Sequence, residues 1–428
     1  MNLKLREHAN QIIEDTIADI QVDSVLRKAL ENHSFPDSII LVAIGKAAWQ
    51  MAKTASDTLG DKIRRGIVVT KYEHSKGNID NCECFEAGHP ILDENSIAAT
   101  NKVIECVNNL NSDDYVLFLV SGGGSALFES PLVSLSELQF INNQLLRSGA
   151  SIYEINTIRK RLSSVKGGKF AALCHPAHVH AVIISDVLGN ALDVIASGPS
   201  CVDNSTSEEA LEIVRKYGLE VSKEVMGYLL IETPKKLNNV SHEIISSVHD
   251  LCCSCASNCE KLGYETMILS EDINGEAKEV GSFLGSIART YANSNKKLAF
   301  IAGGESVVHL RGDGLGGRNQ ELVIGATSNI ESLHNACIFS IGSDGTDGPT
   351  DAAGGYVDGD TLNELLEHDL SVHQILACND AYHALEKVNG LIKTGPTGTN
   401  INDVAVVLID NKNVWLVWII WYYKILNS

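Results

Sequence analysis

Short apolar runs rich in β-branched residues alternate with segments of helical periodicity along most of the chain. The runs cover residues 39–44, 67–70, 115–120, 179–184, 266–269, 298–301, 337–341 and 404–409. Unbroken apolar runs of this length, separated by helices, are typical of buried strands in right-handed β-α-β units. The pattern predicts an α/β fold with mostly parallel sheets that helices cover on both faces. Ligands of such sheets bind beyond the carboxyl ends of the strands, so the residues after each run are the first candidates for chemistry.

The first twenty residues carry a different pattern. Ile12, Ile13, Ile17 and Ile20 fall on one face of a helix that also carries charges of both signs, whereas a signal peptide has an uninterrupted apolar core. We therefore expect an amphipathic helix and a cytoplasmic protein. The eleven cysteines are odd in number and lie in apolar or helical stretches, which fits a reducing compartment in which most of them are thiols.

A polar segment with one proline, residues 231–243, is the predicted crossing between two domains. The expected division is a first domain over residues 1–235, a second over 236–409 and a tail over 410–428. Whether the chain returns from one domain to the other stays open at this point.

The tail is unlike the rest of the chain. It holds three of the four tryptophans, Trp415, Trp418 and Trp421, in an apolar run over residues 414–423. This run is about half as long as a membrane span requires. An altered reading frame and an extra contact in an oligomer such as a homodimer are both compatible with it.

The charge balance excludes some partners. The 428 residues carry a formal net charge of −20. A chain this acidic repels nucleic-acid phosphates and anionic membranes, so we expect a small-molecule substrate and neither nucleic acid nor membrane as a partner. An anionic ligand would need a local basic pocket.

Two separate candidates for binding an anion follow predicted strands. Lys46 follows the run 39–44, at the mouth of the sheet, where a compact positive charge could hold a carboxylate or neutralise a transferring phosphoryl group. A solvated lysine is the alternative. The run 115–120 ends in Ser121, Gly122, Gly123, Gly124 and Ser125, whose backbone N–H groups could cradle an anion. A structural tight turn is the alternative, and neither a Walker A loop nor GxGxxG is present here.

Two further candidates follow in the first half. Residues 156–169 gather five cations, of which we expect one or two, with Lys166 the leading candidate, to face a ligand and the others to lie on the surface. Asp186 follows the run 179–184, where a carboxylate can orient a substrate hydroxyl, ligate Mg²⁺ directly or through water, or cap a helix.

The second half repeats this arrangement. Glu305 follows the run 298–301, and Arg318 ends a glycine-rich loop, where its planar fork suits bidentate contact with phosphate or carboxylate oxygens. Asp344 and Asp347 follow the run 337–341 and suit Mg²⁺ or ordered water, since the spacing is not that of a calcium loop.

A last loop, residues 394–402, adds ligand-binding candidates. Its side chains Thr397 and Asn400 offer hydrogen bonds to a phosphate or an adenine, and two well-capped turns are the alternative.

Two groups with the residue types of zinc sites are assigned to packing instead. Cys252, Cys255 and Cys259 fall on one face of a helix, and the group Cys174, His175, His178 and His180 lacks a second ligand pair at the usual spacing.

Several strings, taken together and in this order, resemble the type II glycerate kinase family, whose carboxy-terminal half is the MOFRL domain. They are VAIGKAAWQMA, EAGHPILDENS, VSGGGSALFESP, NTIRKRLSSVKGGK, ISDVLGN with IASGPS, GGESVVHLRGDGLGGRNQE, GSDGTDGPTDAAGG and TGPTGTNINDV. The resemblance implies two α/β domains, the first a Rossmann-like doubly wound one, with the active site in the cleft between them.

The resemblance also implies a reaction. ATP with Mg²⁺ would phosphorylate D-glycerate to 2-phosphoglycerate, with Lys46 and Arg318 as catalytic residues. Relatives have also been labelled hydroxypyruvate reductases, but a nicotinamide enzyme would be expected to show GxGxxG after a strand and an acidic residue about twenty positions later, and neither is evident. A non-catalytic metabolite sensor is the alternative outside enzymes.

Overall fold

The computed structural model describes residues 1–411 and divides into two compact units. The central unit comprises residues Val22–Ser246, and the terminal unit comprises Met1–Gln21 together with the chain from Ser247 onward. The chain thus starts in the terminal unit, enters the central unit and returns. The expectations for residues 412–428, including the tryptophan-rich tail, fall outside the described residues.

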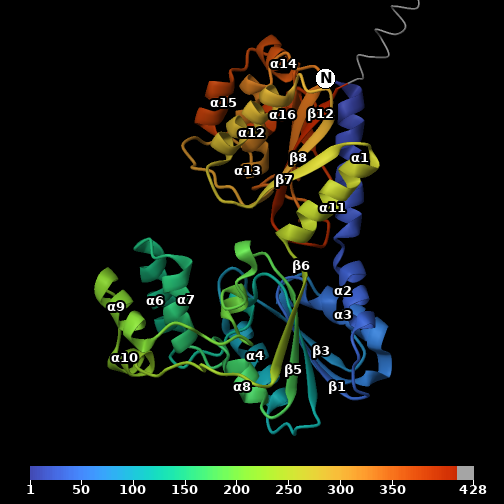
Figure 1. Cartoon of the computed structure of the whole chain (residues 1–428). Coiled ribbons are helices and arrows are strands. Elements are labelled where there is room, and N and C mark those ends of the chain that lie inside the picture. Colours follow the sequence, from blue (N-terminus) through green and yellow to red (C-terminus); the bar gives the residue numbers. More distant parts are fainter. Residues whose placement is uncertain (412–428) are drawn as a thin grey trace, which may run out of the picture. The chain divides into compact units, whose positions relative to one another are not determined.

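The central unit is built on a sheet in which every strand pair is parallel, in the order β3-β2-β1-β4-β5-β6 (Figure 1). Its strands are β1 (Ile39–Ile44), β2 (Ile63–Lys71), β3 (Cys82–Ala87), β4 (Tyr115–Val120), β5 (His178–Ile184) and β6 (Val240–Ser246). The order reverses between β1 and β4, so the loops that leave these two strands diverge to opposite sides. Such a switch point is where doubly wound sheets bind ligands.

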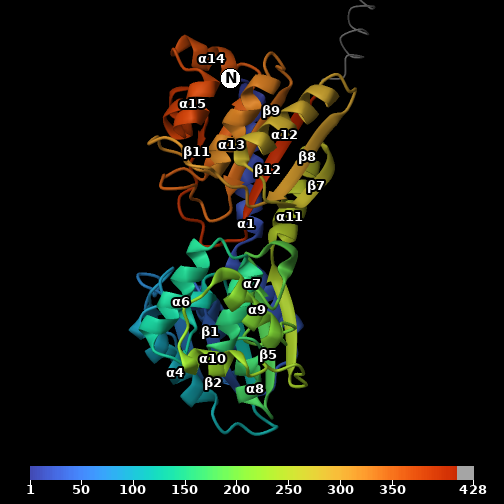
Figure 2. The same ribbon diagram turned by 90° about the vertical axis from the view of Figure 1, so that its left-hand side faces the viewer.

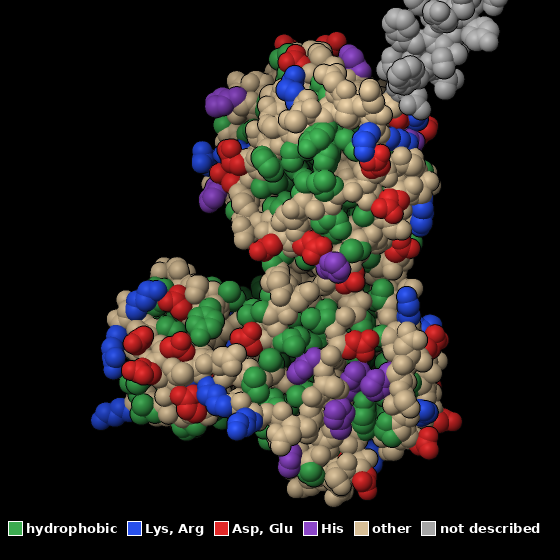
Figure 3. Space-filling model, viewed as in Figure 1, with side chains coloured by type: hydrophobic (Ala, Val, Ile, Leu, Met, Phe, Trp, Pro, Cys, Tyr) green, Lys and Arg blue, Asp and Glu red, His purple; other side chains and the backbone are tan. Residues whose placement is uncertain are grey.

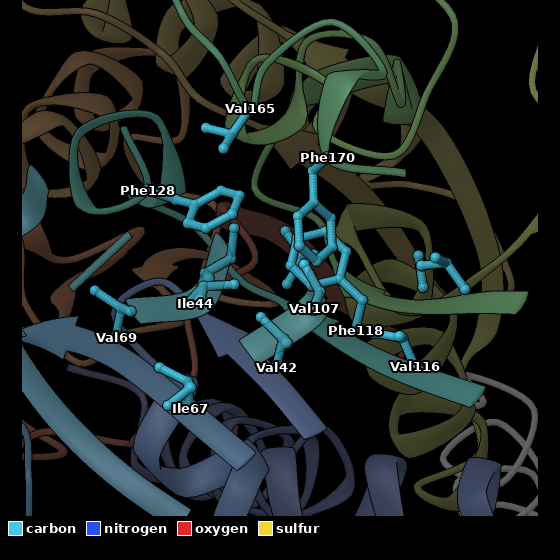
Figure 4. Packing of buried hydrophobic residues seen from close by; sticks show 14 of the residues in the cluster. Val42, Ile44, Ile67, Val69, Val107, Val116, Phe118, Phe128, Val165 and Phe170 are labelled. Carbon is cyan, nitrogen blue, oxygen red and sulfur yellow. The ribbon is translucent and has the colours of Figure 1, made fainter. Parts of the chain in front are cut away.

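Helices cover both faces of this sheet. In Figure 1, α2 (Val22–Asn32) and α3 (Ala48–Leu59) lie on one side, and α4 (Glu94–Val107) and α8 (Lys169–Cys174) lie on the other. Figure 4 shows the second of these interfaces, where Val42 and Phe118 from the strands pack with Val107 and Phe170 from the helices. All four side chains are fully buried, which anchors the strand ends and the loops that follow them.

Four helices form a lobe of their own beside the sheet (Figure 1). They are α6 (Leu135–Arg147), α7 (Ile152–Arg161), α9 (Ser207–Tyr217) and α10 (Lys223–Leu229). Their apolar stripes meet in a separate core that includes Leu138, Ile158, Ile213 and Val225. A four-residue helix, α5 (Gly124–Leu127), connects β4 to this lobe.

The terminal unit has a mixed sheet in the order β11-β10-β9-β12-β8-β7. Its strands are β7 (Glu265–Ile273), β8 (Lys297–Gly304), β9 (Ala336–Gly342), β10 (Gly354–Asp358), β11 (Leu391–Ile392) and β12 (Asp403–Asp410). Only the pair β7 and β8 is parallel within the described residues, and the other four pairs are antiparallel. Because β12 runs against β8 and β9, its first residue lies at the edge where those two strands end.

Helices cover this sheet on both faces as well (Figure 2). One face carries α12 (Ala277–Tyr291) and α13 (Arg318–Ala326), and the other carries α1 (Leu3–Asp19) and α11 (Val248–Lys261). The shorter helices α14 (Thr361–Glu367), α15 (Val372–Cys378) and α16 (Ala381–Lys387) complete the unit. None of the helices within residues 1–411 is long and apolar enough to cross a membrane.

The predicted α/β class with two domains is confirmed, and each of the eight predicted runs lies inside a strand. Parallel pairs predominate over the two sheets together, but the prediction is wrong for the terminal sheet taken alone, in which β12 enters between β8 and β9 in the antiparallel sense.

The domain division also differs from the predicted one. Residues 240–243, the end of the expected crossing, belong to β6, an edge strand of the central sheet, and α1 packs on α11 in the terminal unit. An edge strand is covered less completely, and β6 therefore has a polar composition that resembles a linker.

Candidate active site

Lys46 and the glycine-rich loop Ser121–Ser125 meet at the switch point of the central sheet. Lys46 follows β1, and the loop follows β4, the strand beside it. The Lys46 backbone N–H donates a hydrogen bond to the Gly122 carbonyl at 2.9 Å, and the Ala47 N–H donates to Ser121 Oγ at 3.1 Å. The structure therefore brings these two candidate segments together, which the sequence analysis had treated separately.

The Lys46 side chain is half-buried, and its Nζ makes no hydrogen bond or ion pair with any residue in the range 1–411. Its aliphatic stem passes Gly123, because a Cβ atom on that glycine would lie 3.1 Å from Lys46 Cγ and 3.0 Å from the His89 ring. Gly123 also has a positive φ of 86°, so the close approach and the backbone both favour glycine. The lysine charge is therefore held at the loop by its stem, with its ammonium group free to contact a ligand.

Asp186 reaches the same loop from β5. A Cβ atom on Gly122 would collide with the Asp186 carboxylate, so the absence of a side chain at position 122 allows this approach. Lys46, Gly122 and Asp186 thus come from three adjacent parallel strands, as the strand-end prediction required.

A segment with strained backbone angles contacts the glycine-rich loop. Ala196 and Ser197 both have positive φ angles, 51° and 62°, which are costly for residues with a Cβ atom. Ser197 Oγ lies 3.1 Å from Ser125 Oγ and donates to Asn156 Oδ1 at 3.1 Å. Such strain persists where the surrounding contacts fix the backbone conformation. Here the strained segment places the Ser197 hydroxyl against Ser125.

The cations of residues 156–169 are placed differently from the prediction. Lys160 and Arg161 are buried, and they pair with Asp203 at 3.1 and 3.7 Å. Their charges are therefore neutralised inside the unit rather than exposed on its surface.

Lys166 is fully buried, so the expectation that it faces a ligand does not agree with this structure. Its Nζ donates to the Phe128 carbonyl at 2.7 Å and pairs with Glu129 at 3.1 Å. Burial lowers the pKa of Lys166, and the neighbouring Glu129 carboxylate opposes that effect. The lysine therefore stabilises the segment that follows the glycine-rich loop.

A cavity of about 340 Å³ opens beside the loop, within the central unit. Its polar lining includes His89, Ser125, Glu129, Asn142 and Arg159, and Gly123 borders it as well. Burial, followed by the charges of Lys46 and Lys71, lowers the pKa of His89, so that its ring is neutral at pH 7. Sequence reasoning did not single out His89, although it lies in one of the strings that carry the family resemblance.

Arg318 begins α13 in the terminal unit and is held by two carboxylates. Its Nε and Nη2 donate to the two Asp403 oxygens at 2.5 and 3.0 Å, and its Nη1 donates to Glu305 at 2.8 Å. Burial alone would lower the pKa of Arg318, but the hydrogen bonds and charges of these carboxylates raise it. The guanidinium is therefore charged and fixed in orientation.

Asp403 was not among the predicted site residues. It is the first residue of β12 and meets Gly304 and Gly342, the last residues of β8 and β9. The signals in the sequence were its place directly before the apolar run 404–409 and its presence in the string TGPTGTNINDV. Burial raises the pKa of Asp403 to about 6. The hydrogen bond and charge of Arg318 oppose this effect, and the nearby negative charges of Asp347 and Glu305 add to it.

The two aspartates predicted as metal ligands have different surroundings. Asp347 is buried and accepts hydrogen bonds from the backbone N–H groups of Asn319 and Gln320 at 3.1 and 2.9 Å, so that both of its oxygens cap α13. Asp344 forms a turn with Thr346, and a Cβ atom on Gly342 would lie 3.4 Å from both Asp344 and Asp403. Asp347 is therefore committed to the start of α13, next to Arg318, whereas Asp344 lies at the strand edge that carries Asp403.

Thr397 and Asn400 lie in the last predicted loop. Thr397 donates its hydroxyl to the Ser343 carbonyl, and its N–H donates to the Asp344 carbonyl at 3.2 Å. The loop therefore packs on the segment that carries Asp344, and Asn400 is half-buried in it.

One group in the described part of the chain could hold a metal through at least three of its His, Cys, Asp or Glu side chains. His33, His180 and Glu243 place their donor atoms within 4.8 Å of one another. The rings of His33 and His180 are stacked at 4.1 Å, and Figure 3 shows histidines gathered on this face of the central unit. The group lies toward the amino ends of the strands, at the edge opposite Lys46, and belongs to a cluster of ring contacts in which Phe35 and Tyr115 are tilted or perpendicular to their neighbours.

Comparison with known proteins gives consistent results. A D-glycerate 2-kinase of Thermotoga maritima is 49% identical over 95% of this chain and 98% of its own length. A crystal structure of glycerate kinase from the same organism covers 95% of this chain and all of its own, with a TM-score of 0.93. A protein of Agrobacterium vitis described as a putative hydroxypyruvate reductase is 36% identical over 86% of this chain and 87% of its own.

Fold and site together define an α/β ligand-binding protein with cationic groups at the strand ends of each unit. A family model described as a domain of unknown function, DUF4147, matches residues 8–230, and the MOFRL family model matches residues 298–403. The chain belongs to the glycerate 2-kinases of the MOFRL family.

Proposed function

We propose that this protein transfers the γ-phosphoryl group of ATP to the 2-hydroxyl of D-glycerate, with Mg²⁺, and releases 2-phosphoglycerate and ADP. The observation that carries the proposal is the placement of Lys46 at the switch point, next to a glycine-rich loop and Asp186, with an ammonium group that has no partner within residues 1–411. The relatives named as glycerate 2-kinases support the choice of substrate.

In this proposal positioning and charge stabilisation carry the reaction, because transferring phosphoryl groups pass through a loose transition state. Lys46 and Arg318 stabilise the negative charge on the equatorial oxygens of the transferring group. Asp186 accepts a hydrogen bond from the substrate hydroxyl and orients it for in-line attack, and the Ser121–Ser125 loop holds an anionic group of either ligand.

The carboxylates around Arg318 fit a hard divalent cation by the type of their donor atoms. Asp344 and Glu305 offer oxygen ligands, the kind that Mg²⁺ prefers. The Glu305 oxygens also accept hydrogen bonds from the side chains of Arg318 and Asn402, whereas the buried Asp347 oxygens accept from the backbone N–H groups of α13. When bound, Mg²⁺ would neutralise phosphate charge. Asp344 and Glu305 are the residues that we assign to hold it.

Reduction of hydroxypyruvate with NADH or NADPH is the second candidate, because the Agrobacterium vitis relative bears that description. The loop after β1 reads Gly45-Lys46-Ala47-Ala48 and has no GxGxxG pattern, which argues against a dinucleotide at this switch point. The kinase proposal therefore has the stronger support.

One assay separates these candidates. Purified protein is incubated with ATP, Mg²⁺ and D-glycerate, and phosphorus NMR identifies the product. We expect the 2-phosphate, whereas a 3-phosphate would correct the position of transfer. Oxidation of NADH or NADPH with hydroxypyruvate, without ATP turnover, would favour the reductase. Binding of glycerate without either turnover would indicate a sensor.

A further inference from the structure

Arg159 differs from the two cations that follow it in the chain. Lys160 and Arg161 are each paired with a buried carboxylate, Asp203. Arg159, in contrast, donates only Nε, to the neutral amide oxygen of Asn142 at 2.9 Å. Its Nη1 and Nη2 groups make no hydrogen bond or ion pair with any residue that the structure describes. One edge of this guanidinium is thus fixed, and the other is left for a partner.

That partner would lie in the cavity beside the glycine-rich loop, which Arg159 lines. The charged residues of the lining are Arg159 and Glu129, and Lys166 neutralises Glu129 from the buried side at 3.1 Å. His89 adds no charge at pH 7, since its pKa is lowered. One uncompensated positive charge therefore remains at the cavity, on a group whose mostly buried position makes an unpaired charge costly.

The rest of the lining fits a small polar molecule. Asn142, Asn143 and Gln139 offer amide groups, Ser125 offers a hydroxyl, and Leu138 and Leu146 close the wall. The volume of about 340 Å³ is at the lower end of the range of small-molecule sites, roughly 300 to 1,000 Å³. Gly123 borders both this cavity and the Lys46 stem, so a ligand here would extend toward the proposed reacting group.

We infer that this cavity binds the carboxylate of a small hydroxy acid, and that Arg159 selects substrates that carry this carboxylate. The free Nη1 and Nη2 groups of the Arg159 guanidinium form a fork that matches a carboxylate in bidentate geometry. A single positive charge balances a monoanion but not a triphosphate, which favours the acceptor substrate over the nucleotide. The inference rests on the proposed function for the identity of the acid, D-glycerate.

The test compares Arg159→Gln and Arg159→Lys with the wild type. We expect Arg159→Gln to raise the KM for D-glycerate about ten- to a hundredfold, since one charge-assisted contact is lost, while the KM for ATP changes less than twofold. Arg159→Lys should recover only part of this loss, because an ammonium cannot reproduce the fork. The preference for glycerate over glycerol, which lacks the carboxylate, should fall by a similar factor.

Calorimetric titration with D-glycerate in the absence of ATP gives a readout that needs no turnover. Arg147→Gln, at the exposed end of α6, is the matched control and should bind like the wild type. An unchanged glycerate KM and affinity in folded Arg159→Gln, or a raised KM for ATP alone, would overturn the inference. A wild type that binds glycerate through Arg159 but transfers no phosphate would contradict the proposed function and leave the inference standing.

Discussion

The two cations assigned to phosphoryl transfer are held in opposite ways. Lys46 in the central unit is fixed only through its backbone and stem, and its ammonium group has no partner within residues 1–411. Arg318 in the terminal unit is clamped by Asp403 and Glu305 through three hydrogen bonds. The difference indicates a division of labour, in which Lys46 supplies an adaptable charge and Arg318 supplies a pre-oriented one.

Removal of the adaptable charge should have the largest effect. We expect Lys46→Ala to lower kcat by two to four decades, about 3 to 5 kcal/mol of transition-state stabilisation, because the cation assigned to the transferring group at this loop is lost. Stability should change little, since the lysine ammonium has no partner to lose. Steady-state kinetics and thermal unfolding check both statements.

Lys53→Ala is the matched control for this experiment. Lys53 lies in α3 and makes an exposed ion pair with Asp57, of the kind that contributes little to stability or activity. A folded Lys46→Ala enzyme with near-normal turnover would contradict the assigned role.

The role of Arg318 should depend on the planar shape of its guanidinium group. We expect Arg318→Lys to lower kcat about a hundredfold, since an ammonium cannot keep both the clamp to Asp403 and a contact to the ligand. Arg289 donates hydrogen bonds to backbone carbonyls at an exposed position, so the control variant Arg289→Lys should have a near-normal kcat. If the two cations act on the same phosphoryl group, the double variant with Lys46→Ala should lose much less than the product of the two single losses. Multiplicative losses would show that they act independently.

The clamp itself should depend on pH through Asp403. Its pKa is about 6 in the folded protein, against about 4 for an unfolded aspartate. Between these values the folded state binds the extra proton, so the contribution of this group to the free energy of unfolding is largest at low pH and is lost as the pH rises through about 6. Activity should move the other way, because a protonated Asp403 releases Arg318.

Asp403→Asn should remove both trends. We expect its kcat to be about tenfold lower at pH 7.5 and to lack the acidic limb near pH 6 that the wild type shows. Urea unfolding from pH 5 to 8 compares the stabilities. An acidic limb that persists in Asp403→Asn would assign the titration to another group.

The sequence predicted the residues whose place in the site depends on strand order. It did not predict the contacts between charged side chains that lie far apart in the chain or on strands of unknown direction. Lys46, the glycine-rich loop and Asp186 each follow an apolar run, and parallel strands bring such positions to one edge. Lys166 and Asp403 show the limit. The polarity of Lys166 suggested an exposed or ligand-facing cation, but Glu129, 37 positions earlier in the chain, pairs with it in the interior. Asp403 reaches Arg318 only because β12 is antiparallel, which a single strand pattern does not reveal.

The same reasoning explains the missed strands. The edge strands β3 and β6 are only partly buried and carry charged or polar residues, so their patterns lack the unbroken apolar runs of β1 and β4. β10 begins with two glycines, and β11 has two residues.

The smallest effect is expected at Gly122, where the absence of a side chain allows Asp186 to approach the loop. Gly122→Ala adds a methyl group that would collide with the Asp186 carboxylate, so Asp186 has to move away from the loop. We expect kcat to fall about tenfold and the free energy of unfolding to fall by about 1 to 3 kcal/mol, as for overpacked sites. Gly227→Ala is the matched control, because a Cβ atom there meets no other atom within 4 Å and α10 should gain about 0.5 to 1 kcal/mol from alanine. If Gly122→Ala instead behaves like Gly227→Ala in both kinetics and urea unfolding, the position of Asp186 is not important to the reaction. The contrast between an adaptable and a pre-oriented charge would then rest on Lys46 and Arg318 alone.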